Sequence, residues 1–152
     1  MTQHQVLIIG IGNVVLRDEG VGVHAAWRLK EERLPPGVEV IDGGTATMDL
    51  LAAIQKAERI IVIDAVKGGG VPGTVYRVRP DELSQETEHP LSLHQAGFLD
   101  VLGLARQRGG APEVVIIGVE PKEIAWGMEL TPEVSGKLPN VIAAVFAELK
   151  GL

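Results

Sequence analysis

Residues 10–22 read Gly-Ile-Gly-Asn-Val-Val-Leu-Arg-Asp-Glu-Gly-Val-Gly, and they directly follow an aliphatic run at residues 6–9. The aliphatic run predicts a buried first strand. Glycines allow the backbone to turn sharply after this strand and to approach a ligand closely. Two adjacent carboxylates, Asp18 and Glu19, come after the turn. Because open α/β folds place their sites at the carboxyl edge of parallel strands, this stretch predicts both a fold class and the position of a site.

The rest of the chain alternates between strand and helix patterns. Strands are predicted at residues 6–9, 38–41, 60–63, 74–78 and 114–119. Helices are predicted over residues 20–34, 47–57, 93–108 and 131–150, with Val23, Ala26 and Trp27 facing inward in the first and a bend at Pro139 in the last. This order predicts a three-layer α/β/α sandwich around a doubly wound, mostly parallel sheet of about five strands. The edge strand 74–78 could run antiparallel.

Composition narrows the class of protein. A chain of 152 residues fits one domain, residues 1–152. The net charge of −6, without a Lys/Arg cluster, argues against a nucleic-acid surface. The absence of cysteine excludes disulfides, thiolate zinc sites and a cysteine nucleophile. Because neither a signal-peptide pattern nor an apolar run long enough for a bilayer is visible, we expect a cytoplasmic protein with no membrane partner. The acidic surface and the absence of an obvious apolar patch in the periodicity favour a monomer.

The glycine motif raises the question of nucleotide binding. The dinucleotide fingerprint needs a third glycine at position 15, which holds Val15. Neither a P-loop, a Gly-x-Ser-x-Gly elbow nor a His-Glu-x-x-His helix is present in the sequence. We therefore expect no nucleotide cofactor, and a nucleotide-binding oxidoreductase domain is the less favoured alternative.

Acidic residues and a histidine stand at the ends of predicted elements. Glu19 follows the first strand, Asp64 ends the third, and His94 begins a helix. If the first and third strands are neighbours, their carboxyl ends lie about 5 Å apart. Two carboxylates there need a cation, and a site of one imidazole and two carboxylates suits nickel, zinc, manganese or Fe(II) with open positions. Asp42, which ends the second strand, could act as a base or support the metal ligands.

Several of the same residues also have structural interpretations. Asp18 could cap the helix that begins at Glu19. Ser92 and Gln95 match a capping box and need no catalytic role. His24 is expected to have a structural role at the boundary of the first helix. The glycine-rich loop 67–73 is expected to be mobile.

Seven separated motifs resemble the hydrogenase maturation endopeptidases, in the right order and over nearly the whole chain. They are Gly10-x-Gly12-Asn13-x-x-Leu16-x-Asp18-Glu19-Gly20-x-Gly22, Asp42-Gly43-Gly44-Thr45, Ile63-Asp64-Ala65, Pro72-Gly73-Thr74, Ser92-x-His94-Gln95 with Leu99-x-x-Leu102, Gly118-Val119-x-Pro121 and Leu130-Thr131-Pro132. The resemblance implies a peptidase that removes the carboxyl-terminal extension from the precursor of a [NiFe] hydrogenase large subunit after nickel insertion.

The resemblance also implies roles for individual residues. Glu19, Asp64 and His94 match the residues that contact the metal, and Asp42 matches the acid of the Asp-Gly-Gly motif. The nickel would come with the precursor, which is the expected partner. The candidate catalytic residues are Asp64, Asp42 and Glu19, in an aspartic-type or metal-dependent peptidase. A non-catalytic chaperone that grips the nickel-loaded precursor is the alternative.

Overall fold

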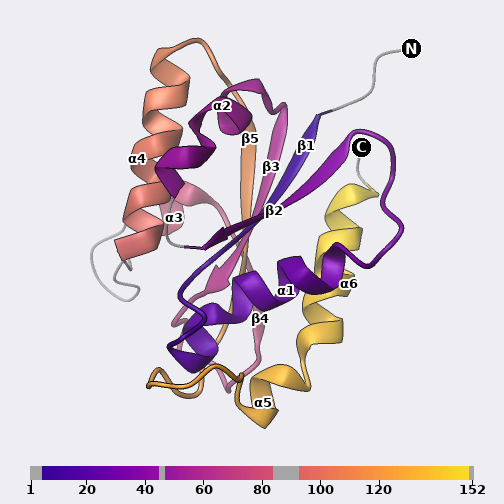
Figure 1. The fold of residues 1–152 in the computed structure, drawn as a ribbon, viewed down its shortest axis with the longest axis vertical. Coiled ribbons are helices and arrows are strands. Elements are labelled where there is room, and N and C mark those ends of the chain that lie inside the picture. The colour runs from indigo at the N-terminus through magenta and orange to yellow at the C-terminus, as the bar shows by residue number, and fades with distance from the viewer. Residues whose placement is uncertain (1–4, 45–46, 84–92, 151–152) are drawn as a thin grey trace.

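The computed structural model describes residues 5–44, 47–83 and 93–150, which form one five-stranded sheet with helices on both faces (Figure 1). The strands are β1 (Val6–Ile11), β2 (Val38–Gly44), β3 (Arg59–Ala65), β4 (Val75–Val78) and β5 (Glu113–Val119). The helices are η1 (Arg17–Gly20), α1 (Val21–Leu29), η2 (Thr47–Leu50), α2 (Leu51–Lys56), α3 (Pro80–Leu83), α4 (Leu93–Gln107), α5 (Pro132–Ser135) and α6 (Leu138–Leu149), where η marks a 3-10 helix.

The order of strands across the sheet is β2-β1-β3-β5-β4. All neighbouring pairs are parallel except β4 with β5, so the predicted sheet and its antiparallel edge strand are confirmed. β1 pairs with β2 on one side and with β3 on the other. The chain therefore reverses its direction of winding at β1. Ligands of open α/β sheets bind at such a switch point, outside the carboxyl ends of the strands.

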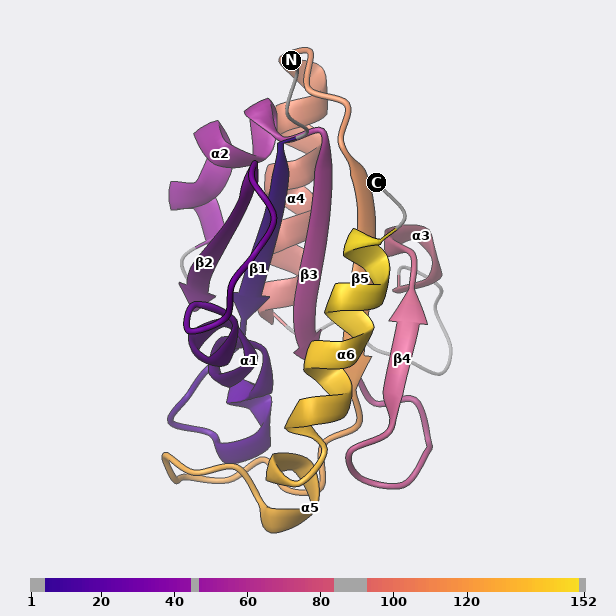
Figure 2. The same cartoon turned by 90° about the vertical axis from the view of Figure 1, so that its right-hand side faces the viewer.

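Helices on both faces explain why the central strands are apolar throughout. Along β1, Val6 and Ile8 join the core under α1 and α6, whereas Leu7 and Ile9 join the core under α2 and α4. Figure 2 shows the sheet between these two helical layers, with the loops that follow β1, β3 and β5 gathered at one end of the molecule. Within the ranges that the structure describes, none of the helices combines the length and the hydropathy that a bilayer crossing requires.

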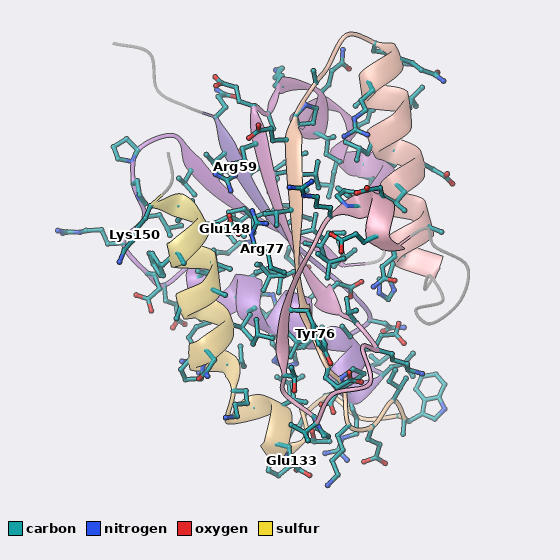
Figure 3. All side chains as sticks on the ribbon, turned by 180° about the vertical axis from the view of Figure 1, so that it is seen from behind. Arg59, Tyr76, Arg77, Glu133, Glu148 and Lys150 are labelled. Carbon is teal, nitrogen blue, oxygen red and sulfur yellow. The ribbon has the colours of Figure 1, made fainter. Side chains whose placement is uncertain are left out.

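An ion-pair cluster fastens α6 to the sheet far from those loops. The carboxylate of Glu148 on α6 accepts a hydrogen bond of 2.5 Å from Nη2 of Arg59 on β3, and another from the guanidinium of Arg77 on β4 (Figure 3). Glu148 keeps only 9% of its surface exposed. Two arginines thus compensate one buried carboxylate, which is the condition under which a buried charge is tolerated.

The first helix differs from the prediction. It ends at Leu29 and not near residue 34, and Trp27, which was predicted to face inward, is 43% exposed. The helix lies so close to β1 that a Cβ on Gly10 would come within 2.8 Å of the Cβ of Ala26. Because the contact is this close at position 26, an alanine fits there, and the neighbouring Trp27 lies outside the buried face of the helix.

The last predicted helix is two helices. α5 ends at Ser135, and α6 begins at Leu138 after a break at Gly136 and Lys137. Pro139 lies in the first turn of α6, where a missing N–H leaves no helical hydrogen bond unmade. The predicted bend at Pro139 is therefore wrong: the proline helps to start a helix.

Candidate functional site

Three side chains that are far apart in the sequence meet beyond the carboxyl ends of β1 and β3. Asp64 lies in β3, Glu19 lies in η1 directly after β1, and His94 is the second residue of α4. The Nε2 atom of His94 lies 3.0 Å from Oδ1 of Asp64, and its Nδ1 atom lies 3.4 Å from Oε1 of Glu19. Asp64 has no exposed surface and His94 only 7%. β1 and β3 are neighbours in the sheet, so the premise on which this convergence was predicted holds.

Burial dominates the electrostatics of this cluster. Burial raises the pKa of Asp64 above its usual value, although His94, the Gln95 amide and the Ala65 N–H all favour the charged carboxylate. Burial lowers the pKa of His94, but the hydrogen bond to Asp64 and the charges of Asp64 and Glu19 outweigh it and raise that pKa overall. Both groups therefore hold a proton more tightly than usual, and they titrate as a coupled pair.

The two carboxylate oxygens of Asp64 differ in their hydrogen bonding, and one of them can bind a further ligand. Its Oδ1 atom accepts the N–H of Ala65 at 2.8 Å in addition to His94. Its Oδ2 atom is buried, and no described residue donates to it with good hydrogen-bond geometry. A buried carboxylate oxygen without a firm partner is costly. Such an oxygen is a natural position for a substrate group or a cation.

The glycines of the opening motif bring Glu19 to this position. Gly12 has a φ of +135°, and a Cβ there would lie 2.1 Å from the carbonyl oxygen of Glu19 and 3.5 Å from Oδ1 of Asp64. A Cβ on Gly22 would lie 2.0 Å from the carbonyl oxygen of Ile63. Only glycine allows these approaches. The motif therefore packs η1 and α1 against β1 and β3, beside the candidate site.

Asp18 does not cap a helix, so that prediction is wrong. No side-chain cap bond is made at the start of η1. Asp18 instead accepts the backbone N–H groups of Lys122, Glu123 and Thr131, and the Thr131 hydroxyl, at 2.8–3.0 Å. Burial raises the pKa of Asp18, but these hydrogen bonds outweigh it and hold the pKa below its usual value. Asp18 is thus a buried anion that ties the loop after β5 to the loop after β1.

Arg17 adds to this connection. It has a φ of +50°, its N–H donates to the carbonyl of Gly127 at 2.9 Å, and its guanidinium pairs with Glu123 at 2.8 Å. The N–H of Gly127 donates to the carbonyl of Val15 at 3.0 Å. A non-glycine residue in the left-handed region persists only where its surroundings hold it there. The two loops therefore form one rigid unit around Glu19.

Asp42 lies at the same sheet edge but outside the cluster. It sits near the end of β2, one strand beyond β1, and its side chain is exposed. Its Oδ2 atom accepts the indole N–H of Trp27 at 2.9 Å. The structure thus brings Glu19, Asp64 and His94 together and leaves Asp42 apart, fixed by the tryptophan that was predicted to be buried.

The loop after β3 is held by a residue that the sequence did not single out. Oε1 of Glu120 accepts the N–H of Gly68 at 2.7 Å, the N–H of Gly70 at 3.1 Å and the hydroxyl of Tyr76 at 2.7 Å. Glu120 is 7% exposed. The loop was expected to be mobile because it is rich in glycine, but a buried carboxylate organises its backbone. An acid directly after the apolar strand β5 was the available signal.

Gln95 makes a contact that the capping-box prediction did not include. Its amide donates to the carbonyl of Ala65 at 2.9 Å and so links α4 to the end of β3. Ser92, the other half of the predicted capping box, lies outside the described residues. His24, expected to be structural, packs its ring against Trp27 with centroids 5.0 Å apart.

One imidazole and two carboxylates are suitable ligands for a metal of intermediate softness such as nickel or zinc. In this structure, however, the ring of His94 lies between the two acids. Its two nitrogens face different carboxylates, and no group of three His, Asp or Glu side chains among the described residues surrounds a common metal position. A first-row metal needs its nitrogen and oxygen ligands at about 2.0–2.2 Å. The hydrogen bond between His94 and Asp64 must therefore open before both could bind one ion.

Comparison with known proteins identifies the family. A family model described as HycI, hydrogenase maturation protease, matches residues 23–148. The chain belongs to the hydrogenase maturation protease family. Membership makes it a protease, and thus a hydrolase. Because the match includes β3, α4 and β5, the family assignment covers the elements that carry Asp64 and His94.

Curated relatives agree with this assignment. Hydrogenase expression/formation protein HupD of Rhodobacter capsulatus is 40% identical over 150 residues, which cover 96% of this chain and 71% of that protein. Hydrogenase 2 maturation protease of Escherichia coli K12 is 34% identical over 149 residues, which cover 96% of this chain and 91% of that protein. Hydrogenase expression/formation protein HoxM of Azotobacter vinelandii is 46% identical, and the chain spans 61% of its length.

Solved structures share the fold. Hydrogenase maturating endopeptidase HybD from E. coli has a TM-score of 0.87 and 32% identity, covering 97% of this chain and 93% of that one. [NiFe] hydrogenase maturation protease HybD from Thermococcus kodakarensis has a TM-score of 0.77 and 28% identity, covering 94% and 97%. The three-layer fold with its mostly parallel sheet is thus a family property.

Proposed function

We propose that this protein is the endopeptidase that removes the carboxyl-terminal extension from the nickel-loaded precursor of a [NiFe] hydrogenase large subunit. Family membership supports a protease of hydrogenase maturation. The observation that carries the finer proposal is the cluster of one imidazole and two carboxylates at the switch point of the sheet. These are ligands that nickel accepts.

The nickel in this proposal belongs to the substrate. Cysteine thiolates of the precursor hold the ion, and Glu19, Asp64 and His94 offer it further ligands. The buried Oδ2 atom of Asp64, without a firm hydrogen-bond partner, supports such an encounter. In the absence of substrate the imidazole is bound to Asp64 at 3.0 Å. When that hydrogen bond opens, His94 and Asp64 can bind the nickel of the precursor in place of each other. Recognition of the precursor then depends on the presence of nickel.

Asp42 is the carboxylate that we propose as the general base. A carboxylate that is bound to nickel is a weaker base because the cation draws on its electron density, which disfavours Asp64 and Glu19 for proton abstraction from water. Asp42 is exposed at the same edge, and the Trp27 indole fixes its orientation. Asp42 and Asp64 lie two strands apart, on the order of 10 Å laterally. Nickel then marks the precursor and positions it, while cleavage occurs at a peptide bond some distance from the ion.

Incubation with nickel-loaded and nickel-free precursor tests the function. We expect a mass loss equal to the extension with the loaded form only. His94→Ala should abolish both cleavage and the preference for binding loaded precursor. Asp42→Asn should abolish cleavage but keep that preference, because it leaves the three nickel-facing side chains intact. A wild-type protein that binds loaded precursor and releases no peptide would be a chaperone, and the proposal would be wrong.

A further inference from the structure

The loop after β5 exposes apolar side chains at the edge that carries the candidate site. Trp126 is 81% exposed, Met128 59% and Ile124 40%. We call these three residues the apolar tip. The other large apolar side chains that are exposed among the described residues are Val71, at 74% in the loop after β3, and Trp27, at 43% on α1. An exposed apolar patch of a few hundred Å² on a folded protein is often functional.

The apolar tip is not exposed because its loop is loose. Asp18 binds the backbone before and after the tip, at Glu123 and Thr131. Between them, Gly127 exchanges two backbone hydrogen bonds with Val15 and Arg17, at 3.0 and 2.9 Å. Every one of these anchors lies in the segment that also carries Glu19. The tip is therefore held in a fixed position relative to the candidate site.

The size of the tip favours a transient partner. Its three side chains expose on the order of 400 Å² together, since a large aromatic side chain offers 150–250 Å². A stable protein–protein interface buries about 800 Å² on each partner. The tip alone is too small for a permanent dimer. It is large enough to anchor a substrate that is bound, cleaved and released.

The charge of the loops around the apolar tip indicates the charge of its partner. The segments that follow β1, β3 and β5, residues 12–20, 64–74 and 118–133, contain seven acidic and three basic residues. Their formal charge is −4, and three of these acids, Asp18, Asp64 and Glu120, are buried beneath the edge while the other four are at least partly exposed. An edge of this sign attracts a basic surface and speeds its encounter. The complementary partner therefore presents an apolar side chain surrounded by lysine or arginine.

We propose that the apolar tip is the docking surface for the hydrogenase large-subunit precursor, and that it contacts a basic surface of the precursor with an apolar residue at its centre. This inference rests on the proposed function. Docking at the tip holds the precursor while Glu19, on the same rigid unit, faces its nickel. The tip supplies binding energy that does not depend on the metal.

Steady-state cleavage of nickel-loaded precursor, together with direct measurement of its Kd, tests the proposal. Trp126→Ala and Met128→Ala should each raise KM and Kd at least about tenfold and change kcat less than about threefold. Trp126→Phe should keep KM within about threefold of the wild type. Because these side chains are exposed, the variants should keep the circular dichroism spectrum of the wild type. Higher salt should raise KM for every variant.

The outcomes separate the two proposals. A wild-type KM in both alanine variants, with cleavage intact, overturns the docking surface and leaves the proposed function standing. If the wild type binds precursor but releases no peptide, a tenfold weaker Kd for Trp126→Ala still supports docking while the proposed function fails. If Trp126→Ala instead converts a dimer of this chain into a monomer in sedimentation, the tip is a self-association contact and the docking proposal is wrong.

Discussion

Asp64 and Asp18 are both fully buried at the same sheet edge, yet their carboxylates have opposite electrostatic environments. Burial raises the pKa of Asp64, whose firm partners are one histidine and one backbone N–H. Burial also acts on Asp18, but three backbone N–H groups and a hydroxyl reverse its effect and lower the pKa. Asp18 is thus satisfied by the fold, and Asp64 is left with bonding capacity. This difference separates a structural acid from a candidate functional one.

Asp18→Asn should therefore destabilise the protein strongly. In the wild type the N–H groups of Lys122 and Glu123 donate to the Asp18 carboxylate. An asparagine would place its NH₂ group against these N–H donors, so that hydrogen bonds are lost and two donors face each other. We expect the free energy of unfolding to fall by about 2–4 kcal/mol in urea titrations. Asp64→Asn is the matched control, and its free energy of unfolding should fall by less than about 1 kcal/mol. Equal losses in the two variants would contradict the assignment of Asp18 as the structural anchor.

His94→Ala should remove cleavage without unfolding the protein. The imidazole touches Asp64 and Glu19, and its loss leaves a hole at the sheet edge and not in either core layer. We expect the rate of precursor cleavage to fall at least about a hundredfold, which corresponds to about 2.7 kcal/mol of transition-state stabilisation. Mass spectrometry of the precursor measures the rate, and circular dichroism checks the fold. Normal cleavage by this variant would remove His94 from the site.

His24 should make stability depend on pH in a defined direction. Burial lowers the pKa of His24, although its bond to the Met128 backbone and the charge of Asp18 act the other way. Its Nε2 atom is buried and has no partner among the described residues. The unfolded chain, with a histidine pKa of about 6.5, takes up a proton first as pH falls. Stability is therefore lost as pH falls from about 6.5 toward the folded pKa.

Replacing His24 by glutamine should flatten this dependence. The difference in melting temperature between wild type and variant, measured from about pH 5 to about pH 8, subtracts the contributions of all other groups. We expect the wild type to lose more stability than the variant on acidification. Cleavage should persist in His24→Gln, because the ring lies outside the Asp64 cluster and because Trp27, against which it packs, keeps its own hydrogen bond to Asp42. Parallel pH curves for the two proteins would show that His24 does not titrate abnormally.

Glu148→Gln should destabilise the protein without affecting the chemistry. It removes the charge that binds both Arg59, at the start of β3, and Arg77 on β4 (Figure 3). Breaking a buried ion pair on one side costs about 3–5 kcal/mol, and we expect the lower half of that range because Arg77 is largely exposed. Glu133→Gln, which removes an exposed partner of Lys122, should leave the urea midpoint unchanged. A loss of kcat in Glu148→Gln would mean that the two ends of the sheet are coupled.

The sequence predicts the sheet because its strands are short apolar runs separated by clear turn residues. The same logic predicts the meeting of Glu19, Asp64 and His94, since carboxyl ends of neighbouring parallel strands share an edge. Helix ends and helix faces are predicted less well. Trp27 fits the periodicity of an inward position, but the close approach of α1 to β1 excludes it. That approach depends on Gly10 in the strand as well as on Gly22 in the helix, so the periodicity of the helix alone does not reveal it.

The roles of Asp18 and Glu120 could not be predicted from local pattern. Asp18 precedes a helical turn, so a cap is the natural interpretation, but its partners lie 104–113 residues further along the chain. Glu120 grips a loop about 50 residues before it. Neither contact leaves a periodic trace in the sequence. Such contacts join loops that lie side by side only because of the order of strands in the sheet. They can be recognised only once that strand order is known.

The long reach of Asp18 has a consequence for how the molecule is made. A contact that spans 113 residues forms only when most of the chain has been synthesised and its ends have been brought together, which is the entropically slow part of folding. The segment around Glu19 leaves the ribosome early but gains its final shape late. We therefore expect protease activity to appear only at the end of folding. A nascent or truncated chain should not cleave the hydrogenase precursor.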